Sequence, residues 1–434
     1  MSELPVNLED RLTLADELHA RPTQTVQTPA RVTQVAVLVD PAQRGAEIDH
    51  LAALCARWSQ PGPAPEAVFF ATGQDGLALR WERHGEFSSY AFFAPGAGEA
   101  PFGEVPTHAL PSGWLAAIPG RTVFAGHALV IRCPEPDPDP GELRTYFGDN
   151  VPVGSEIGAG AGIALSDFRV HPDGFSRLLL LDRHMTPRQC GRMLQRLFEI
   201  ETYRMLALVS LPIARGLWPL ISAMERTLKD LTEDVSEPAT NDSALLERLT
   251  KFAAQVEFEL SRSQGRFAAS RAYRDLVDTR IRELREARVP GIQPIGEFMA
   301  RRFVPATQTI ASAERRLRDL SERIGRVSTL LSARVDIAQE SQTQALLASL
   351  DRRAEEQLKL QRVVESLSVA AIVYYGSGLV GHLVEALEAA GLHVHPEIPV
   401  GLSIPAITGA CMWALHRAHR RTAALADRRQ SPRP

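Results

Sequence analysis

Two apolar stretches without a charged side chain lie near the carboxyl end of this 434-residue chain, Leu367–Val384 and Ile398–Leu415. Each has eighteen residues, close to the roughly twenty that a helix needs to cross the hydrocarbon core of a bilayer. A short acidic segment joins them and an arginine-rich tail follows. The pattern predicts a transmembrane hairpin over residues 367–415, with spans at 367–384 and 398–415.

Basic residues flank both predicted spans on one side. Arg352, Arg353, Lys359 and Arg362 precede the first span, the tail 416–434 holds six arginines, and the segment Glu385–Glu397 has no Lys or Arg. Because Lys and Arg are enriched in cytoplasmic loops, both termini are expected to be cytoplasmic. A soluble helical core rich in Gly, Ser and Pro is the alternative, but length and charge together favour the membrane.

Composition indicates a large soluble part and excludes several classes. The chain is 44% hydrophobic and 23% charged with a net charge of −4, so it can bury a core and gives no nucleic-acid signal. Cys55, Cys133, Cys190 and Cys411 lack any Cys-x-x-Cys spacing, which argues against zinc ribbons and disulfides. The acidic first ten residues do not form a secretory signal. We expect no cofactor.

The overall prediction is an α+β fold with a cytosolic α/β domain, a long helical coiled-coil stalk and the transmembrane hairpin. A helical arm is expected at 1–30, the α+β domain at 31–185 and the stalk at 186–366. Candidate strands are Val32–Val39, Ala67–Ala71, Ala78–Arg83, Tyr90–Ala94, Thr122–Arg132 and Arg177–Leu181, with a helix at Ala46–Trp58. From Thr186 onward only helices are expected.

The predicted stalk contains three helical segments. A helix from Pro187 to about Leu211, bent or ended by Pro212 and Pro219, is followed by helices at Asp242–Arg288 and from Pro305 onward. Heptad positions follow Pro305 and predict a coiled-coil seam: Ile310, Ala313, Leu317, Leu320, Ile324, Val327 and Leu331. We expect this last helix to run for about eighty residues, roughly 120 Å, into the first span. The apolar run Met205–Ala214 is too short to span a bilayer and is interpreted as a buried helix.

Two glycine-rich motifs suggest nucleotide or anion binding but lack the required context. Gly376–Gly381 spells a dinucleotide fingerprint without a βαβ unit, so Gly376, Ser377, Gly378 and Gly381 are interpreted as small residues that allow close helix packing in lipid. Gly154–Gly162 lacks the Gly-Lys-Ser/Thr ending of a P-loop and is expected to be a structural loop.

Two polar clusters in the soluble part are candidate sites. Asp167, Arg169 and His171 lie beside the turn sequence His171-Pro-Asp-Gly174. The other cluster, Glu17, His19 and Arg21, precedes Pro22, and its spacing favours a solvated helix end with the proline as the stop. Neither contains a nucleophile–base pair at catalytic spacing, so no catalytic residue is predicted.

The segment between the spans is a weak candidate for cation binding. Its acidic and histidine side chains would line the mouth of a pore or bind a divalent cation: Glu385, Glu388, His393, His395 and Glu397. A solvated acidic turn is the alternative. Tyr374, Tyr375 and His382 are polar groups inside or near the first span, so they need partners in a helix bundle or a water path.

Four long motifs connect this chain to a known family. They are ELHARP at Glu17–Pro22, GSEIGAGAGIALSDFRVHPDGFSR at Gly154–Arg177, GRMLQRLFEIETYRMLALVSLPIAR at Gly191–Arg215 and ESLSVAAIVYYGSGLVGHL at Glu365–Leu383. The chain resembles domain-of-unknown-function family 3422, bacterial proteins predicted to be membrane-anchored. The resemblance implies a membrane anchor and supplies no activity or catalytic residue. With both termini cytoplasmic, the expected location is the bacterial inner membrane.

The order of parts is also similar to pentameric magnesium channels, but their Gly-Met-Asn signature is absent at Gly381–Leu387. Fold analogy of this kind is weak evidence for function. We expect a cytosolic scaffold or sensor tethered to the lipid bilayer, with an oligomeric cation channel as the alternative and an enzyme as a third hypothesis. A homo-oligomer formed through the stalk and first span is expected in either of the first two cases.

Overall fold

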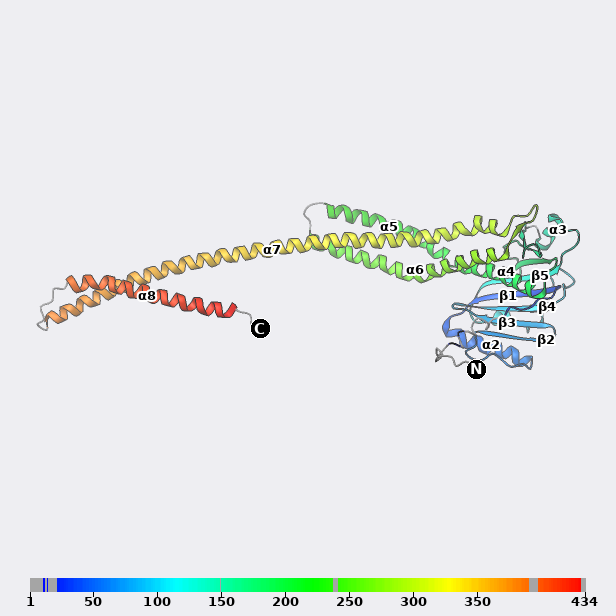
Figure 1. The fold of residues 1–434 in the computed structure, drawn as a ribbon, viewed down its shortest axis with the longest axis horizontal. Coiled ribbons are helices and arrows are strands. Elements are labelled where there is room, and N and C mark those ends of the chain that lie inside the picture. The colour runs from blue at the N-terminus through cyan, green and yellow to red at the C-terminus, as the bar shows by residue number, and fades with distance from the viewer. Residues whose placement is uncertain are drawn as a thin grey trace, which may run out of the picture. The chain divides into compact units, whose positions relative to one another are not determined.

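The computed structural model describes residues 11, 14, 22–148, 150–236, 241–389 and 397–430, with the backbone alone at 388–389 and 418–430. The chain divides into two compact units, Met1–Leu330 and Leu331–Pro434. The first unit combines a sheet with helices and the second consists of long helices (Figure 1). The predicted α+β class is confirmed, whereas the unit boundary falls inside the predicted stalk.

One mixed sheet forms the centre of the first unit. Its strands, among the residues described, are β1 Ala30–Leu38, β2 Phe69–Gln74, β3 Leu77–Arg83, β4 Phe87–Pro95, β5 Arg121–Arg132, β6 Val153–Ile157, β7 Gly162–Ser166, β8 Ser176–Asp182 and β9 Ala287–Arg288. Their order is β2-β3-β4-β1-β5-β8-β7-β6-β9, and within it β5 and β8 pair in parallel. Asp75 and Gly76, both with positive φ, make the tight turn between β2 and β3.

The expectation of a loop at Gly154–Gly162 is wrong, because most of this segment belongs to the β6–β7 hairpin. Its glycines serve close strand packing. A Cβ on Gly154 would lie 2.4 Å from the Ala164 carbonyl oxygen, and one on Gly162 would lie 2.5 Å from that of Leu181. Short β9 also corrects the expectation that strands end before Thr186.

Helices cover both faces of the sheet (Figure 1). Helix α2, Arg44–Arg57, packs its Leu51 and Leu54 against one face, where Trp81 and Phe92 are fully buried. Helix α4, Pro187–Leu208, packs against the opposite face. Alternate side chains of β1, β3 and β4 therefore enter two different layers. On the α2 side, short helix α3, Pro140–Arg144, covers a further apolar cluster near β7 and β8.

Three predicted helix boundaries need correction. Thr186 begins α4 with a capping box, and the helix ends at Leu208. Helix α5, Leu211–Ser236, contains Pro212 in its first turn, where a proline is tolerated because it removes an N–H that has no intrahelical partner. The helix also continues through Pro219. Helix α6, Asp242–Leu284, ends four residues before the predicted end at Arg288. Its C-cap residue, Arg285, has a left-handed backbone with φ 49°.

The next helix, α7, is Ile295–Ala389 and starts ten residues before Pro305. Ser155 Oγ accepts a hydrogen bond from the Ile295 N–H at 3.1 Å, and the Glu286 carboxylate accepts one from Gly296 N–H at 3.1 Å. These side chains satisfy amide groups that have no partner within the helix, and the carboxylate suits the positive end of the helix dipole. The early start was missed because these caps lie outside the local sequence.

The predicted heptad seam of α7 is buried from Ile310 to Ile324 within the first unit. Ile310, Ala313 and Leu317 form one cluster with residues of α5 and α6, including Leu217 and Phe267. Arg316 adds an ion pair to Glu225 of α5 at 2.6 Å. This part of the seam is therefore buried by α5 and α6 of the same chain and not by a coiled coil between two copies of the protein.

The second unit holds the remainder of α7 and α8, Glu397–Gln430. Glu385, predicted in a loop, lies in α7. Three helical stretches of the described chain are long and apolar enough to cross a membrane: Pro187–Ser236, Ile295–Leu387 and Glu397–Arg417. Their apolar windows are 33%, 6% and 0% buried by the protein. The first therefore contributes to the protein core, and the other two have apolar surface that the described chain does not cover. The run Met205–Ala214, predicted as one buried helix, spans the end of α4 and the start of α5 and is only partly buried.

Candidate functional site

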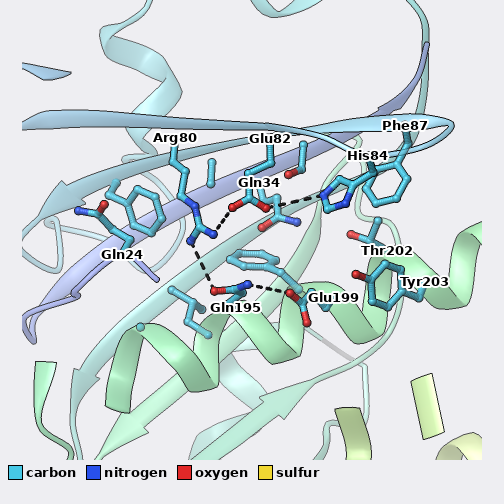
Figure 2. Close-up of a pocket in the computed structure, with 16 residues that line it drawn as sticks. Gln24, Gln34, Arg80, Glu82, His84, Phe87, Gln195, Glu199, Thr202 and Tyr203 are labelled. Atoms are coloured by element: carbon cyan, nitrogen blue, oxygen red, sulfur yellow. Dashed lines mark hydrogen bonds and ion pairs between the residues drawn. The ribbon is translucent and has the colours of Figure 1, made fainter. Parts of the chain in front are cut away.

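A pocket lies between the sheet and α4 in the first unit (Figure 2). Its lining combines polar and aromatic side chains from the segment before β1, from β1, β3, β4 and their connections, and from α4: Gln24, Gln34, Arg80, Glu82, His84, Phe87, Ser89, Ala91, Phe93, Gly191, Leu194, Gln195, Phe198, Glu199, Thr202 and Tyr203. The centres of water-sized molecules have about 40 Å³ available. This space holds roughly three waters or a small ligand.

A buried ion pair forms the sheet side of the pocket. Arg80 and Glu82 are next-but-one neighbours on β3, so both point toward α4 and bind each other through Nη2 and Oε1. Only 7% and 8% of these residues is exposed. His84 Nε2 lies 3.7 Å from the second Glu82 oxygen. Burying two charges costs several kcal/mol each before they attract one another, so stability alone is a weak reason for such a pair.

Helix α4 supplies the opposite polar wall. Gln195 donates a hydrogen bond from Nε2 to Glu199 at 2.8 Å, and its Oε1 lies 3.5 Å from Arg80 Nη1. The Arg80–Gln195 contact joins the helix to the ion pair across the pocket, and the bond to Glu199 holds the Gln195 side chain from within α4 (Figure 2). Gln195 and Glu199 are one helical turn apart, which places both side chains on the face toward β3.

Two buried polar atoms at the pocket have no hydrogen-bond partner among the residues that the structure describes. They are Nε of Arg80 and Oγ1 of Thr202, and Thr202 is only 2% exposed. A buried donor or hydroxyl without a partner costs about 1–3 kcal/mol, and such groups are usually satisfied by water or a ligand. At this pocket the unpaired atoms lie beside open space, so a water or a small ligand can supply the missing partners.

A buried carboxylate of α2 on the opposite face of the sheet contrasts with this arrangement. Glu47, on the α2 side, accepts hydrogen bonds from Trp81 Nε1 at 3.0 Å and from Tyr90 Oη at 2.9 Å, and Arg83 lies 3.3 Å away. Burial, followed by the Glu47 charge, raises the pKa of Tyr90. Because its carboxylate is saturated by protein groups, Glu47 has a structural role.

Two ion pairs connect the pocket to α6. Glu199 pairs with Arg280, and Glu86, in the β3–β4 connection, pairs with Arg266 through two contacts of 2.6 and 2.8 Å. Burial alone would raise the pKa of the Glu86 carboxyl, but hydrogen bonds from Arg266 and Tyr273 outweigh it and hold the pKa below its ordinary value. The pocket walls are thus fixed to α6 by charge-assisted bonds.

Helix α6 in turn contacts the beginning of α7. Arg271 of α6 pairs with Glu314 of α7, and Phe267 packs with Ile310 and Leu317. Pocket, α6 and the first part of α7 therefore form one continuous set of contacts within the first unit. Physical continuity makes coupling feasible without demonstrating it.

The predicted Asp167 cluster is partly assembled. His171 Nε2 lies 2.8 Å from Asp167 Oδ2, which also accepts from Asn150 Nδ2 at 2.8 Å, while Arg169 contributes its backbone N–H to Oδ1 at 3.2 Å and its side chain is exposed. The predicted turn at His171–Gly174 is present, closed by Gly174 N–H to the His171 carbonyl at 2.8 Å. These bonds orient the loop. Among the described residues, no serine, cysteine or threonine side chain is hydrogen-bonded to the side chain of Asp167 or His171.

Several other candidates fall outside the described part of the chain. Glu17, His19 and Arg21 do so, as do His393, His395 and the side chain of Glu388. Among the residues that are described, no group of three or more metal-binding side chains is assembled. Glu385 is exposed and lies 3.3 Å from His382 Nδ1, and Glu397 begins α8 with an exposed side chain.

The small residues of the first predicted span differ in their surroundings. A Cβ on Gly376 would lie 2.9 Å from Ile407 of α8, and one on Gly381 would lie 3.7 Å from Val400. Gly378 has open space around it, and Ser377 donates to the Tyr374 carbonyl at 3.0 Å. Gly376 therefore allows α7 and α8 to approach closely, whereas a Cβ at Gly381 would make an ordinary van der Waals contact.

The sequence analysis did not identify the pocket. Arg80 and Glu82 alternate with apolar residues in β3, a pattern typical of a solvated sheet face, and α4 covers that face from more than a hundred residues away. The only local signal is an acid and a base at spacing two in a strand, which places them side by side.

The comparisons with known proteins bear on the whole chain. The model of the family described as "Protein of unknown function (DUF3422)" matches residues 7–422. The chain belongs to this family. No curated protein and no solved structure matches it. Family membership confirms the resemblance found in the sequence, and the pocket described above is the site that can be argued from structure in this DUF3422 protein.

Proposed function

We propose that this DUF3422 protein is a membrane-tethered sensor. Its sheet unit lies in the cytoplasm and binds a small molecule in the pocket, and its two long apolar helices form a hairpin in the bacterial inner membrane. The observation that carries the proposal is α7, a single helix that begins at the sheet caps Ser155 and Glu286 and includes the first apolar stretch.

The pocket supports this assignment over a simple anchor, and the apolar helices support the membrane part. An anchor needs no pocket with unpaired buried polar atoms, and it needs no ion pairs from that pocket to α6. The apolar windows at the carboxyl end are almost wholly uncovered by protein, as expected for surface that faces lipid. Ligand binding can bias the hairpin only if the ligand has different affinity for two states of the protein.

The membrane part is tested by extraction of full-length protein from bacterial membranes. Protein that stays in the membrane pellet after treatment with alkaline carbonate supports a spanning hairpin. Release into the supernatant rejects it.

The coupling is tested with an environment-sensitive thiol dye on Cys411 of α8. Cys411 is partly exposed, whereas Cys55, Cys133 and Cys190 are buried, so the native chain offers one favoured labelling position. In vesicles, the double substitution R80L/E82L should shift the dye emission relative to wild type. Ser88→Ala, which removes an unpaired buried hydroxyl on the opposite sheet face, should not. Identical emission in all three proteins would reduce the hairpin to a passive tether.

A second candidate function, an oligomeric cation channel, is favoured by Tyr374 and Tyr375. Each is 75% exposed in the first predicted span, and phenol hydroxyls in lipid need partners that further copies would supply. Against it, the heptad seam is already used inside each chain. Light scattering in mild detergent, corrected for the detergent, decides: a ring-sized oligomer with ion flux in liposomes favours the channel, and a monomer or dimer excludes a central pore.

A further inference from the structure

We infer that the pocket between β3 and α4 binds a small zwitterionic amino acid. The inference rests on the proposed function in one respect, because it names the molecule that the sensor detects. It is argued from charge balance, from the arrangement of donors and acceptors, and from size.

Charge balance excludes a ligand with net charge. Arg80 is neutralised by Glu82 and Glu199 by Arg280, so the pocket wall is neutral as a whole. Arg80 and Glu82 are each more than nine-tenths buried. A lone anion or cation would therefore leave an uncompensated charge in a poorly hydrated site, which is strongly unfavourable. A molecule carrying both charges keeps the balance.

The positions of the polar groups match such a molecule. Arg80 presents an unpaired Nε–H, a donor for a carboxylate. Glu82 lies beside it on the same strand face, and its second carboxylate oxygen is 3.7 Å from His84 Nε2. This oxygen can accept a hydrogen bond from an ammonium group. One carbon separates the two charges of an amino acid, which suits two side chains that lie side by side. Figure 2 shows both facing Gln195 and Glu199 across the pocket.

Size and apolar surface limit the ligand side chain. About 40 Å³ is open to the centres of water-sized molecules, which excludes large amino acids. Phe87, Phe93 and Phe198 line the apolar part, where a methyl or methylene group would pack. Thr202 Oγ1, buried and unpaired, lines the same space. A small side chain, such as that of alanine or serine, fits these restrictions.

The test is titration calorimetry on the full-length protein in detergent, with L-alanine and L-serine as probes. Acetate and methylammonium, each carrying one of the two charges, are the comparison ligands. We expect measurable binding of at least one amino acid and binding at least tenfold weaker for both single-charge ligands. Equal affinity for acetate or methylammonium, or no heat with either amino acid at 10 mM concentration (roughly the weakest range for a specific small ligand), overturns the inference.

Three variants complete the test. R80L/E82L should abolish binding, and Thr202→Val, which keeps the side-chain shape, should weaken it about fivefold through loss of one hydrogen bond. Ser88→Ala, outside the pocket, should leave it unchanged. Undiminished binding in R80L/E82L with intact thermal unfolding places the ligand elsewhere and refutes the site.

The inference and the proposed function fail in different ways. If amino acids do not bind but R80L/E82L still shifts the Cys411 dye, the ligand class is wrong and the sensor proposal stands. If amino acids bind with no change at Cys411 in either ligand or variant, the binding site stands and the coupling is rejected.

Discussion

Breaking the Arg80–Glu82 pair on one side should destabilise the first unit far more than removing both charges. In Glu82→Leu, Arg80 stays buried, and the acceptor that remains is Gln195 Oε1 at 3.5 Å. Loss of one partner from a buried pair costs about 3–5 kcal/mol, which lowers the midpoint of thermal unfolding by roughly 10 °C for a unit of this size. In R80L/E82L no charge is stranded, so the loss should be smaller by about 2 kcal/mol or more.

The assay is the intrinsic tryptophan fluorescence of the chain, followed during heating in detergent; Trp81, one of its five tryptophans, is fully buried on the same strand. Glu247→Gln is the control, because Glu247 and Lys251 form an exposed pair on α6 with side chains 68% and 74% exposed. Such a pair contributes about 0.5 kcal/mol at most. If Glu82→Leu costs no more than the control, or if the double variant is less stable than Glu82→Leu, the pair is not the buried charge couple that the structure indicates.

Three further predictions concern the framework of the first unit. Gly191→Ala would place a Cβ 1.8 Å from the Gln24 carbonyl oxygen and should cost about 3 kcal/mol or more, whereas Gly265→Ala in α6 meets open space and should stabilise by about 0.5–1 kcal/mol; thermal melts compare them. Burial lowers the pKa of the His127 imidazole from 6.5 to about 4 in the folded protein. As the pH falls from 6.5 to 4, the unfolded chain binds a proton that the folded protein does not, so up to about 3 kcal/mol of folding free energy is lost. His127→Gln should flatten this dependence of stability on pH. Thr186→Ala, which removes the α4 cap, should cost about 1 kcal/mol in urea unfolding.

The sequence predicts those elements of the fold whose signals are local. Apolar and β-branched runs predict β1, β3, β4, β5 and β8, and the spacing of Leu and Ile predicts the long helices. Strands β6 and β7 were missed because Gly154 and Gly162 suggest a loop, although the glycines are required by close strand contact. The heptads after Ile310 are correct as a buried stripe, but a stripe does not specify whether its partner is another chain or, as here, α5 and α6.

The candidate site was less predictable. Asp167 and His171 are four positions apart in the sequence and in contact in space, so their proximity could be predicted from the sequence. The pocket needs Arg80 and Gln195, 115 positions apart, and only the packing of α4 on the sheet brings them close. Residues in the loop between the two apolar stretches, such as His393, lie outside the described residues, and their expected cation binding stays a prediction.

Strand β3 also has a consequence for how the chain reaches its native pairing. Its residues alternate between Leu79 and Trp81 on one face and Arg80 and Glu82 on the other. Sliding the strand by a single residue would put Trp81 into the polar pocket and drive two charges into the apolar layer beneath α2. Both misplacements cost free energy, so the Arg80–Glu82 pair disfavours a shifted strand register during folding. The R80L/E82L variant should therefore form mispaired species that refold slowly.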